Sequence, residues 1–271
     1  MYELQGDSTE DMQDWGRVIR PHIEGALVQT LASDSPTHMS ITASSLLVPS
    51  ESILQELRTV NPYCADCGSA IPEWASINLC IMVCIECSGV HRKLGTHISK
   101  VRSITLDKWT FNSLQLLITI GNERANAVWE ASLAEAESEI ESILKPTPSA
   151  TMEDRERYIN CKYVSREYVF ARDATKEQKE SHLLKSAYDG DLVGTMAAIA
   201  AGADINIRDH ELRTALHFSS VGHHVLCVEL LCQLGASVNV VDAQGMSPFD
   251  NAMAAGFTDI LDILYAFGGR S

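Results

Sequence analysis

The sequence has no long apolar run, and its first residues lack the marks of a secretory signal. No stretch approaches the ~18–20 apolar residues that a helix needs to cross a bilayer. The opening segment, MYELQGDSTEDM, contains neither a basic region nor an apolar stretch. These absences predict a cytoplasmic protein. Thiols stay reduced in that compartment, so the eight cysteines predict a metal site and core packing rather than disulfides.

An excess of basic residues is also missing. Lys and Arg number 21 against 36 Asp and Glu, which gives a formal net charge of −15 at pH 7. A protein that binds nucleic acid mainly through phosphates is normally basic, at least locally. The charge balance therefore predicts no nucleic-acid partner. The hydrophobic share of 45% is ordinary for a globular protein, and 271 residues suffice for two modest domains.

The N-terminal segment predicts one helix followed by a linker. In STEDMQDWGRVIRPHIEGAL, an apolar face forms at helical spacing from Met12, Trp15 and Ile19. Residues 31–49 are rich in Ser and Thr and contain two prolines, which is typical of a linker. An acidic, amphipathic final helix with such a tryptophan resembles the end of a pleckstrin-homology (PH) domain. Residues 1–30 are interpreted as the C-terminal helix of an incomplete PH-like domain, and the alternative is a leader helix packed on its neighbour.

The last third of the chain repeats with a period of 33 residues. The segment GADIN at 202–206 recurs as GASVN at 235–239, and Asp209 recurs as Asp242. This period, with a T-P-L-H-x-A-like opening at each helix pair, resembles the ankyrin repeat. Residues 180–271 are therefore expected to form an α-helical stack of about three repeats, the last one truncated. Because so short an array buries little core, we expect it to dock on the preceding domain, which acts as its cap.

The central cysteines have the spacing of a metal site. Two C-x2-C pairs separated by 16 residues match the pattern of a four-cysteine zinc site. The ligands would be Cys64, Cys67, Cys84 and Cys87. Four thiolates complete a tetrahedron and leave no position for water, so the spacing predicts one structural Zn²⁺. A pair of redox dithiols and a set of core cysteines are the alternatives.

The residues around the cysteines resemble the catalytic domain of Arf GTPase-activating proteins (ArfGAPs). The resemblance rests on WASINL from Trp74, CIECSGVHR from Cys84, LGTHISKVRSITLD from Leu94, IGNERANAVWE from Ile120 and ERYINCKY from Glu156. It covers residues 50–172, and with the repeats it indicates the centaurin type of that family. It implies a mixed α/β, mostly helical fold in which a short sheet is surrounded by helices. One departure is Cys80, where the family commonly has glycine.

The resemblance gives Arg92 the role of a catalytic arginine that is supplied in trans to an Arf-family GTPase in its GTP-bound form. The chain would then be a GTPase activator rather than an enzyme with its own active site, and the GTP and magnesium would belong to the partner. The residues expected at the contact with the GTPase are Trp74, Lys93 and Asp107. A core position is the alternative for Trp74, and Asp107 is expected to orient the arginine loop by hydrogen bonding. His91 is expected to be structural or on the surface.

A basic cluster surrounds this arginine. It consists of Arg92, Lys93, Lys100, Arg102 and Lys108. Such a cluster in an acidic protein is expected to face the GTPase or an anionic membrane, and its alternative is a solvated face. The repeats are expected to bind another protein or to pack on the zinc domain. Membrane association is expected to be peripheral and to need a complete PH domain. The rival interpretations are a catalytically weak zinc and ankyrin scaffold and a nucleic-acid-binding zinc finger.

Overall fold

The protein is described from a computed structural model that defines residues 46–133, 144–171 and 174–270. The predicted helix within residues 1–30 and most of the predicted linker at 31–49 lie outside these described residues. At the end of that linker, Leu47 exchanges two backbone hydrogen bonds with Trp109, at 2.7 and 2.8 Å. Within the described parts of the chain, no helix has both the length and the apolar character needed to span a membrane.

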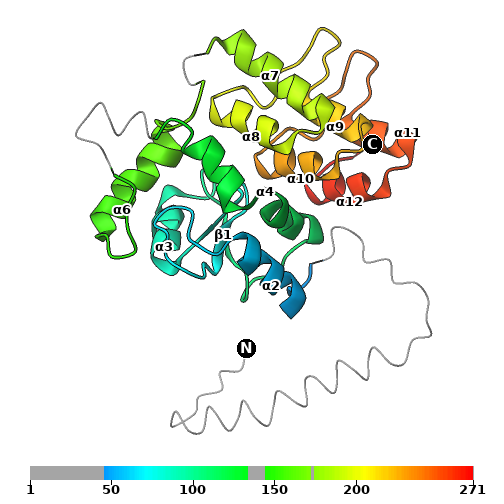
Figure 1. Cartoon of the computed structure of the whole chain (residues 1–271). Helices are drawn as coiled ribbons and strands as arrows, with labels where there is room; N and C mark the ends of the chain where they lie inside the picture. Colours follow the sequence, from blue (N-terminus) through cyan, green and yellow to red (C-terminus); the bar gives the residue numbers. More distant parts are fainter. Residues whose placement is uncertain (1–45, 134–143, 172–173, 271) are drawn as a thin grey trace, which may run out of the picture. The chain divides into compact units, whose positions relative to one another are not determined.

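Residues 46–171, here called the cysteine-rich half, combine helices with a small sheet (Figure 1). The sheet has the order β2-β1-β3, and both pairs of strands are antiparallel. This half agrees with the predicted fold class, a short sheet surrounded by helices. Its elements are α2 (Glu51–Val60), β1 (Trp74–Ser76), β2 (Ile81–Val83), α3 (Ile85–Leu94), β3 (Val101–Ser103), α4 (Phe111–Trp129), α6 (Met152–Ile159) and the π-helical η1 (Asn160–Ser165).

Local sequence signals set the ends and bends of these helices. Ser50 caps α2, and its side chain accepts a hydrogen bond from the backbone N–H of Ile53. Helix α4 bends at Gly121, where φ is +66°. A Cβ atom at this position would lie 2.7 Å from a methyl carbon of Val60, so glycine is needed both for the bend and for the close approach of α2. Helix α4 therefore consists of two helical segments that meet at Gly121.

Residues 174–270, here called the repeat stack, form three helix pairs. The pairs are α7 (Lys176–Asp189) with α8 (Leu192–Ala200), α9 (Ala215–Val221) with α10 (Val225–Gln233), and α11 (Pro248–Ala255) with α12 (Thr258–Ala266). The loops between pairs repeat the same hydrogen bonds. The carboxylate of Asp209 accepts the backbone N–H of Glu211 and Arg213, and Asp242 does the same one repeat later. The predicted ankyrin architecture is confirmed.

The repeat stack packs directly on the cysteine-rich half. Figure 1 shows α8 and α10 beside α4, and these helices are in contact. Apolar residues from both sides, including Leu116 and Ile120 of α4 and Leu230 of α10, belong to one core cluster. At the same junction, the hydroxyl of Ser113 donates a 2.6 Å hydrogen bond to the carboxylate of Glu229. The expected docking of the array on the preceding domain is confirmed.

Candidate functional site

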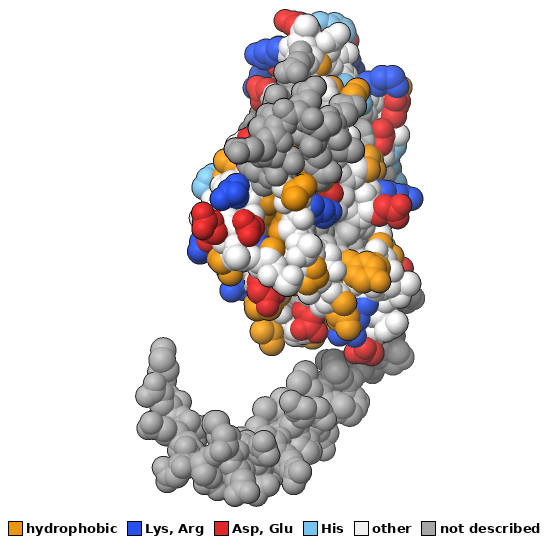
Figure 2. All heavy atoms as spheres, turned by 60° about the vertical axis from the view of Figure 1, so that its left-hand side comes forward, with side chains coloured by type: hydrophobic (Ala, Val, Ile, Leu, Met, Phe, Trp, Pro, Cys, Tyr) orange, Lys and Arg blue, Asp and Glu red, His pale blue; other side chains and the backbone are white. Residues whose placement is uncertain are grey.

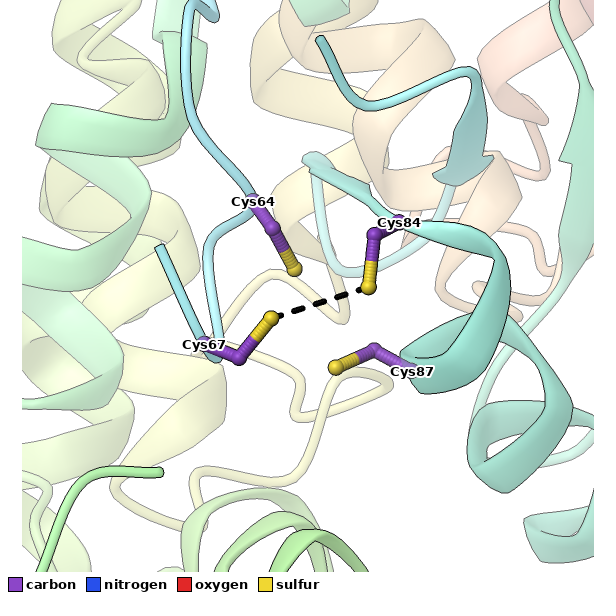
Figure 3. Close-up of side chains that lie close together, drawn as sticks. All are labelled: Cys64, Cys67, Cys84 and Cys87. Atoms are coloured by element: carbon purple, nitrogen blue, oxygen red, sulfur yellow. Dashed lines mark hydrogen bonds between the residues drawn. The ribbon is translucent and has the colours of Figure 1, made fainter. Parts of the chain in front are cut away.

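The four predicted cysteines lie together. Their thiol sulfurs are within 4.8 Å of one another, and Figure 3 shows all four turned towards a common centre. The Sγ atoms of Cys67 and Cys84 are 3.6 Å apart. A tetrahedral zinc site with Zn–S bonds of ~2.3 Å requires S···S distances of roughly 3.8 Å, so this set of donors fits such an ion. Cys64 and Cys67 come from a loop, whereas Cys84 and Cys87 stand at the start of α3.

A buried arginine contacts the cluster from outside. Arg155 in α6 is only 3% exposed, and its guanidinium lies 3.2 Å from the Sγ of Cys87 and 2.6 Å from the carbonyl of Pro148. The guanidinium therefore places positive charge beside the anionic thiolates that a metal would bind. Sequence reasoning missed this residue. A signal was available, because Arg155 shares the inward face of its helix with Tyr158 and Ile159 at spacings of three and four.

A second buried network starts at Asp66, between the first two cysteines. Its carboxylate bonds Lys162 at 3.1 Å, Tyr163 at 2.8 Å and His91 at 2.9 Å, and its side chain is fully buried. Burial alone would raise the pKa of Asp66. The ammonium of Lys162 and the hydrogen bond from His91 outweigh that effect, so the pKa lies well below its usual range. Lys162 also pairs with Glu130, at 2.6 Å, so the network ties η1 and α4 to the cysteine loop.

Arg92 lies on the exposed side of the helix that begins at the cysteines. Helix α3 buries Cys87, Val90 and His91, and Arg92 projects from the neighbouring face into solvent. Its guanidinium carbon stands 4.4 Å from the centre of the half-buried Trp74 ring. Stacking on an aromatic face restricts a long side chain without removing its charge. The structure therefore brings together two of the predicted site residues, one from α3 and one from β1.

Asp107 is connected to this pair through the sheet. Its carboxylate accepts a 2.7 Å hydrogen bond from the backbone N–H of Ser103 in β3. Ser103 is the direct neighbour of Trp74 in the antiparallel pairing of β3 with β1. Asp107 therefore holds the turn that follows β3. The strand residue that it bonds, Ser103, is the one paired with Trp74.

The predicted basic cluster is divided in the structure. Lys93 forms an ion pair with Glu156 of α6. Lys100 is half-buried at the junction with the repeat stack, where its ammonium donates to the carbonyl of Gln233. Arg92, Arg102 and Lys108 remain exposed. Basic and acidic side chains lie interspersed on the face seen in Figure 2, and no large area there carries one sign of charge.

Comparisons with known proteins agree with this geometry. Residues 51–172 match the ArfGap family model, described as "Putative GTPase activating protein for Arf", and residues 183–269 match the model for three ankyrin repeats. A relative from Rattus norvegicus is "Arf-GAP with coiled-coil, ANK repeat and PH domain-containing protein 2", 30% identical over 345 residues. That alignment covers 94% of this chain and 44% of the relative.

Two further relatives extend the comparison. The human protein "Arf-GAP with coiled-coil, ANK repeat and PH domain-containing protein 3" is 39% identical over 181 residues, which cover 61% of this chain and 21% of that protein. The Arabidopsis thaliana "ADP-ribosylation factor GTPase-activating protein AGD2" is 28% identical over 345 residues, 99% of this chain and 44% of that protein. The chain thus spans less than half the length of these relatives.

The fold and the cysteine site therefore define an ArfGAP domain followed by ankyrin repeats. Among the proteins that resemble this chain are Arf-GAPs of the centaurin type, which carry ankyrin repeats and a PH domain.

Proposed function

We propose that this chain accelerates GTP hydrolysis on an Arf-family small GTPase in its GTP-bound form, and that Arg92 is the catalytic arginine. One observation carries the proposal: Arg92 is exposed, stacked on Trp74, and carried by the helix that begins at the cysteine cluster. GTP and its magnesium ion belong to the partner. In this sense the chain is an activator that completes the active site of another protein.

The physical reason lies in the transition state of phosphoryl transfer. Negative charge redistributes over the phosphoryl oxygens, and a planar, permanently charged guanidinium stabilises it. An arginine supplied in trans accelerates hydrolysis by roughly 10³–10⁵-fold. This acceleration equals about 4–7 kcal/mol, at about 1.4 kcal/mol per decade. The gain requires a side chain whose position is set in advance, and the contact with Trp74 supports that requirement.

The metal in this proposal is one Zn²⁺ held by Cys64, Cys67, Cys84 and Cys87. It supplies no reaction step, because four thiolates leave no open position for water or substrate. Its role is to hold the loop of the first two ligands against the start of α3. Helix α3 is thereby fixed at its first turn, and Arg92 lies near the end of that helix.

The remaining site residues are proposed to contact the GTPase or to arrange the contact surface. Trp74 supports the arginine, and Asp107 holds the turn next to β3. Lys93 reaches the GTPase only if it leaves its ion pair with Glu156, and both side chains are accessible enough for that exchange.

The proposed domains are the ArfGAP domain at 50–172 and the ankyrin repeats at 180–271, after a PH-like helix at 1–30 and a linker at 31–49. We further propose a protein partner for the repeats and a cytoplasmic location with peripheral membrane contact.

The test is single-turnover hydrolysis of GTP preloaded on an Arf-family GTPase, with liposomes present. The wild type should accelerate hydrolysis, and Arg92→Lys should lose at least about 10³-fold of that acceleration. Arg124→Lys is the matched control, because Arg124 is also an exposed helical arginine and lies on α4. Zinc content and thermal unfolding should be the same in all three proteins.

The outcome tests the catalytic role of Arg92 and distinguishes a GTPase activator from a scaffold. If Arg92→Lys stays folded, zinc-loaded and fully active, the arginine has no catalytic role. If the wild type binds the GTPase but does not accelerate hydrolysis on any Arf-type substrate, the chain is a zinc and ankyrin scaffold.

A further inference from the structure

We propose that Ser99 is a positioning residue for Arg92. Together with His91, it connects the helix that carries the arginine to the strand that carries Trp74. The proposal rests on the function proposed above for Arg92. It assigns a role to a serine that touches neither the cysteine cluster nor any proposed contact with the GTPase.

The first half of the connection lies on α3. His91 directly precedes Arg92 and is fully buried. Both of its ring nitrogens are engaged: Nε2 lies 2.9 Å from the carboxylate of Asp66, and Nδ1 lies 2.9 Å from the hydroxyl of Ser99. A side chain held at both nitrogens cannot rotate without breaking a buried hydrogen bond. The backbone of α3 at this point is held with it, and Arg92 is the next residue of that backbone.

The second half of the connection lies on β1. The hydroxyl of Ser99 donates a 2.8 Å hydrogen bond to the hydroxyl of Ser76, and both side chains are buried. Ser76 in turn donates to the side-chain oxygen of Asn78, at 3.3 Å. Alternate residues of a strand project on the same face, so Ser76 stands on the same side of β1 as Trp74. Ser99 therefore holds β1, the strand that carries Trp74. The ring of Trp74 lies under the Arg92 guanidinium.

The two halves of this connection meet at Ser99, which bonds to His91 of α3 and to Ser76 of β1. Helix α3 and β1 are also in contact elsewhere, and the ring contact between Arg92 and Trp74 is part of that contact. Within the described residues, however, the chain of side-chain hydrogen bonds from His91 to Ser76 runs through Ser99. Removing the Ser99 hydroxyl leaves the metal ligands and the Asp66–His91 contact in place. It removes both hydrogen bonds through which His91 of α3 is connected to Ser76 of β1. A small shift at that point separates Arg92 from its support, and misplacement of a catalytic group by about 1 Å costs roughly 10²-fold in rate.

The test compares Ser99→Ala with Ser76→Ala, which breaks the same connection from the strand side. Ser88→Ala is the matched control, because Ser88 is equally buried on α3 but donates only to the carbonyl of Ile85 in its own helix. The first readout needs no GTPase. The Nε–Hε NMR signal of Arg92, assigned by its loss in Arg92→Lys, is shifted by the Trp74 ring. We expect that shift to fall in Ser99→Ala and Ser76→Ala and to persist in Ser88→Ala.

The second readout is kinetic, with the GTP-loaded GTPase as substrate. We expect kcat to fall roughly 10- to 100-fold in Ser99→Ala while KM changes less than about twofold. In the Arg92→Lys background, Ser99→Ala should cause no further loss, because the group that it positions is already gone. A purely structural role would instead lower activity by the same factor in both backgrounds, and that result overturns the proposal.

The two readouts separate failure of this proposal from failure of the function itself. If the wild type activates its GTPase and Ser99→Ala changes neither the Arg92 signal nor kcat, the positioning role is wrong. If the wild type shows no activation but the Arg92 signal moves in Ser99→Ala, the GTPase function is wrong and the positioning role stands. If Ser99→Ala loses zinc or unfolds, the same criteria apply to Ser76→Ala.

Discussion

The carboxylates of Asp66 in the cysteine-rich half and of Asp209 in the repeat stack have their partners at very different distances along the chain. Asp66 pairs with Lys162, 96 residues away, and both side chains are fully buried. Asp209 in the stack pairs with Arg213, four residues away, and the same loop recurs one repeat later around Asp242. In the cysteine-rich half such links join distant elements, whereas the loops of the stack repeat a local unit. The long-range bond of Glu229 in the stack lies at its junction with the cysteine-rich half. This contrast predicts that single substitutions have much larger effects in the cysteine-rich half.

Removal of the metal should give the largest effect. In small zinc domains, binding of the ion contributes ~10–16 kcal/mol to folding. We expect Cys67→Ser, or treatment with a chelator, to abolish cooperative unfolding of the cysteine-rich half. The core cluster within the repeat stack contains none of the four ligands, so part of the helical signal should survive. Circular dichroism during thermal unfolding, with zinc measured by mass spectrometry, is the experiment.

Cys227→Ser provides the control for that experiment. Cys227 is equally buried but lies in the stack, away from the cluster. This variant should keep its zinc and lose much less stability. If Cys67→Ser keeps both its zinc and its melting temperature, the ion does not hold this half together.

The buried lysine should give the next largest effect. Lys162 is the ammonium that neutralises Asp66 and Glu130, and it also donates to the side chain of Asn126. Lys162→Met would remove the ammonium that both carboxylates share, leaving Asp66 with His91 and Tyr163 and Glu130 with Lys145. Breaking a buried pair in this way costs about 3–5 kcal/mol. Denaturant unfolding of the zinc-loaded protein measures the loss.

The stack supplies a matched ion pair for comparison. Lys185 pairs with Asp189 four residues along α7, and both side chains are open to solvent. Lys185→Met should leave the unfolding midpoint unchanged, because exposed pairs are screened by water. Equal losses for the two methionine variants would contradict the contrast between the two halves.

Two adjacent leucines of α10 can separate the junction from the stack. Leu230 belongs to the core cluster shared with the cysteine-rich half, whereas Leu231 belongs to the cluster within the stack, and both are fully buried. Each leucine-to-alanine change should cost about 2–5 kcal/mol. Leu230→Ala should also split thermal unfolding into two transitions, because it weakens the contact between the halves. Leu231→Ala should lower the stability of the stack and leave that contact intact. A single transition in both variants, seen by calorimetry, would mean that the junction does not depend on Leu230.

The features that could be predicted from the sequence are local patterns, and those that could not are contacts between residues far apart in the chain. The 33-residue period and the C-x2-C spacings are local patterns, and the structure agrees with both. The partners of Asp66 were not predicted, because a lysine 96 residues away carries no spacing that relates it to an aspartate. Lys100 was placed in an exposed basic cluster, whereas the repeat stack half-buries it, and the pKa of its ammonium is lowered by that burial. A tertiary contact of this kind leaves no pattern in a single sequence.

The last prediction concerns the backbone at Cys80. This residue has φ of +55° and is fully buried in the cysteine-rich half. At turns of the stack, Gly202 and Gly235 have φ of +100° and +95°, whereas Leu212 and His223 have φ of +61° and +56° with a side chain, as Cys80 does. A residue with a side chain costs roughly 1–2 kcal/mol in that region, which glycine avoids.

The experiment compares Cys80→Gly with Cys80→Ala. Both variants lose the buried sulfur, but only alanine keeps the strained backbone with a Cβ atom. We expect the glycine variant to be more stable than the alanine variant by about 1 kcal/mol, measured by denaturant unfolding of the zinc-loaded proteins. That order is the reverse of the usual one, because glycine ordinarily loses more chain entropy on folding. If alanine is the more stable replacement, the positive φ at Cys80 carries no strain.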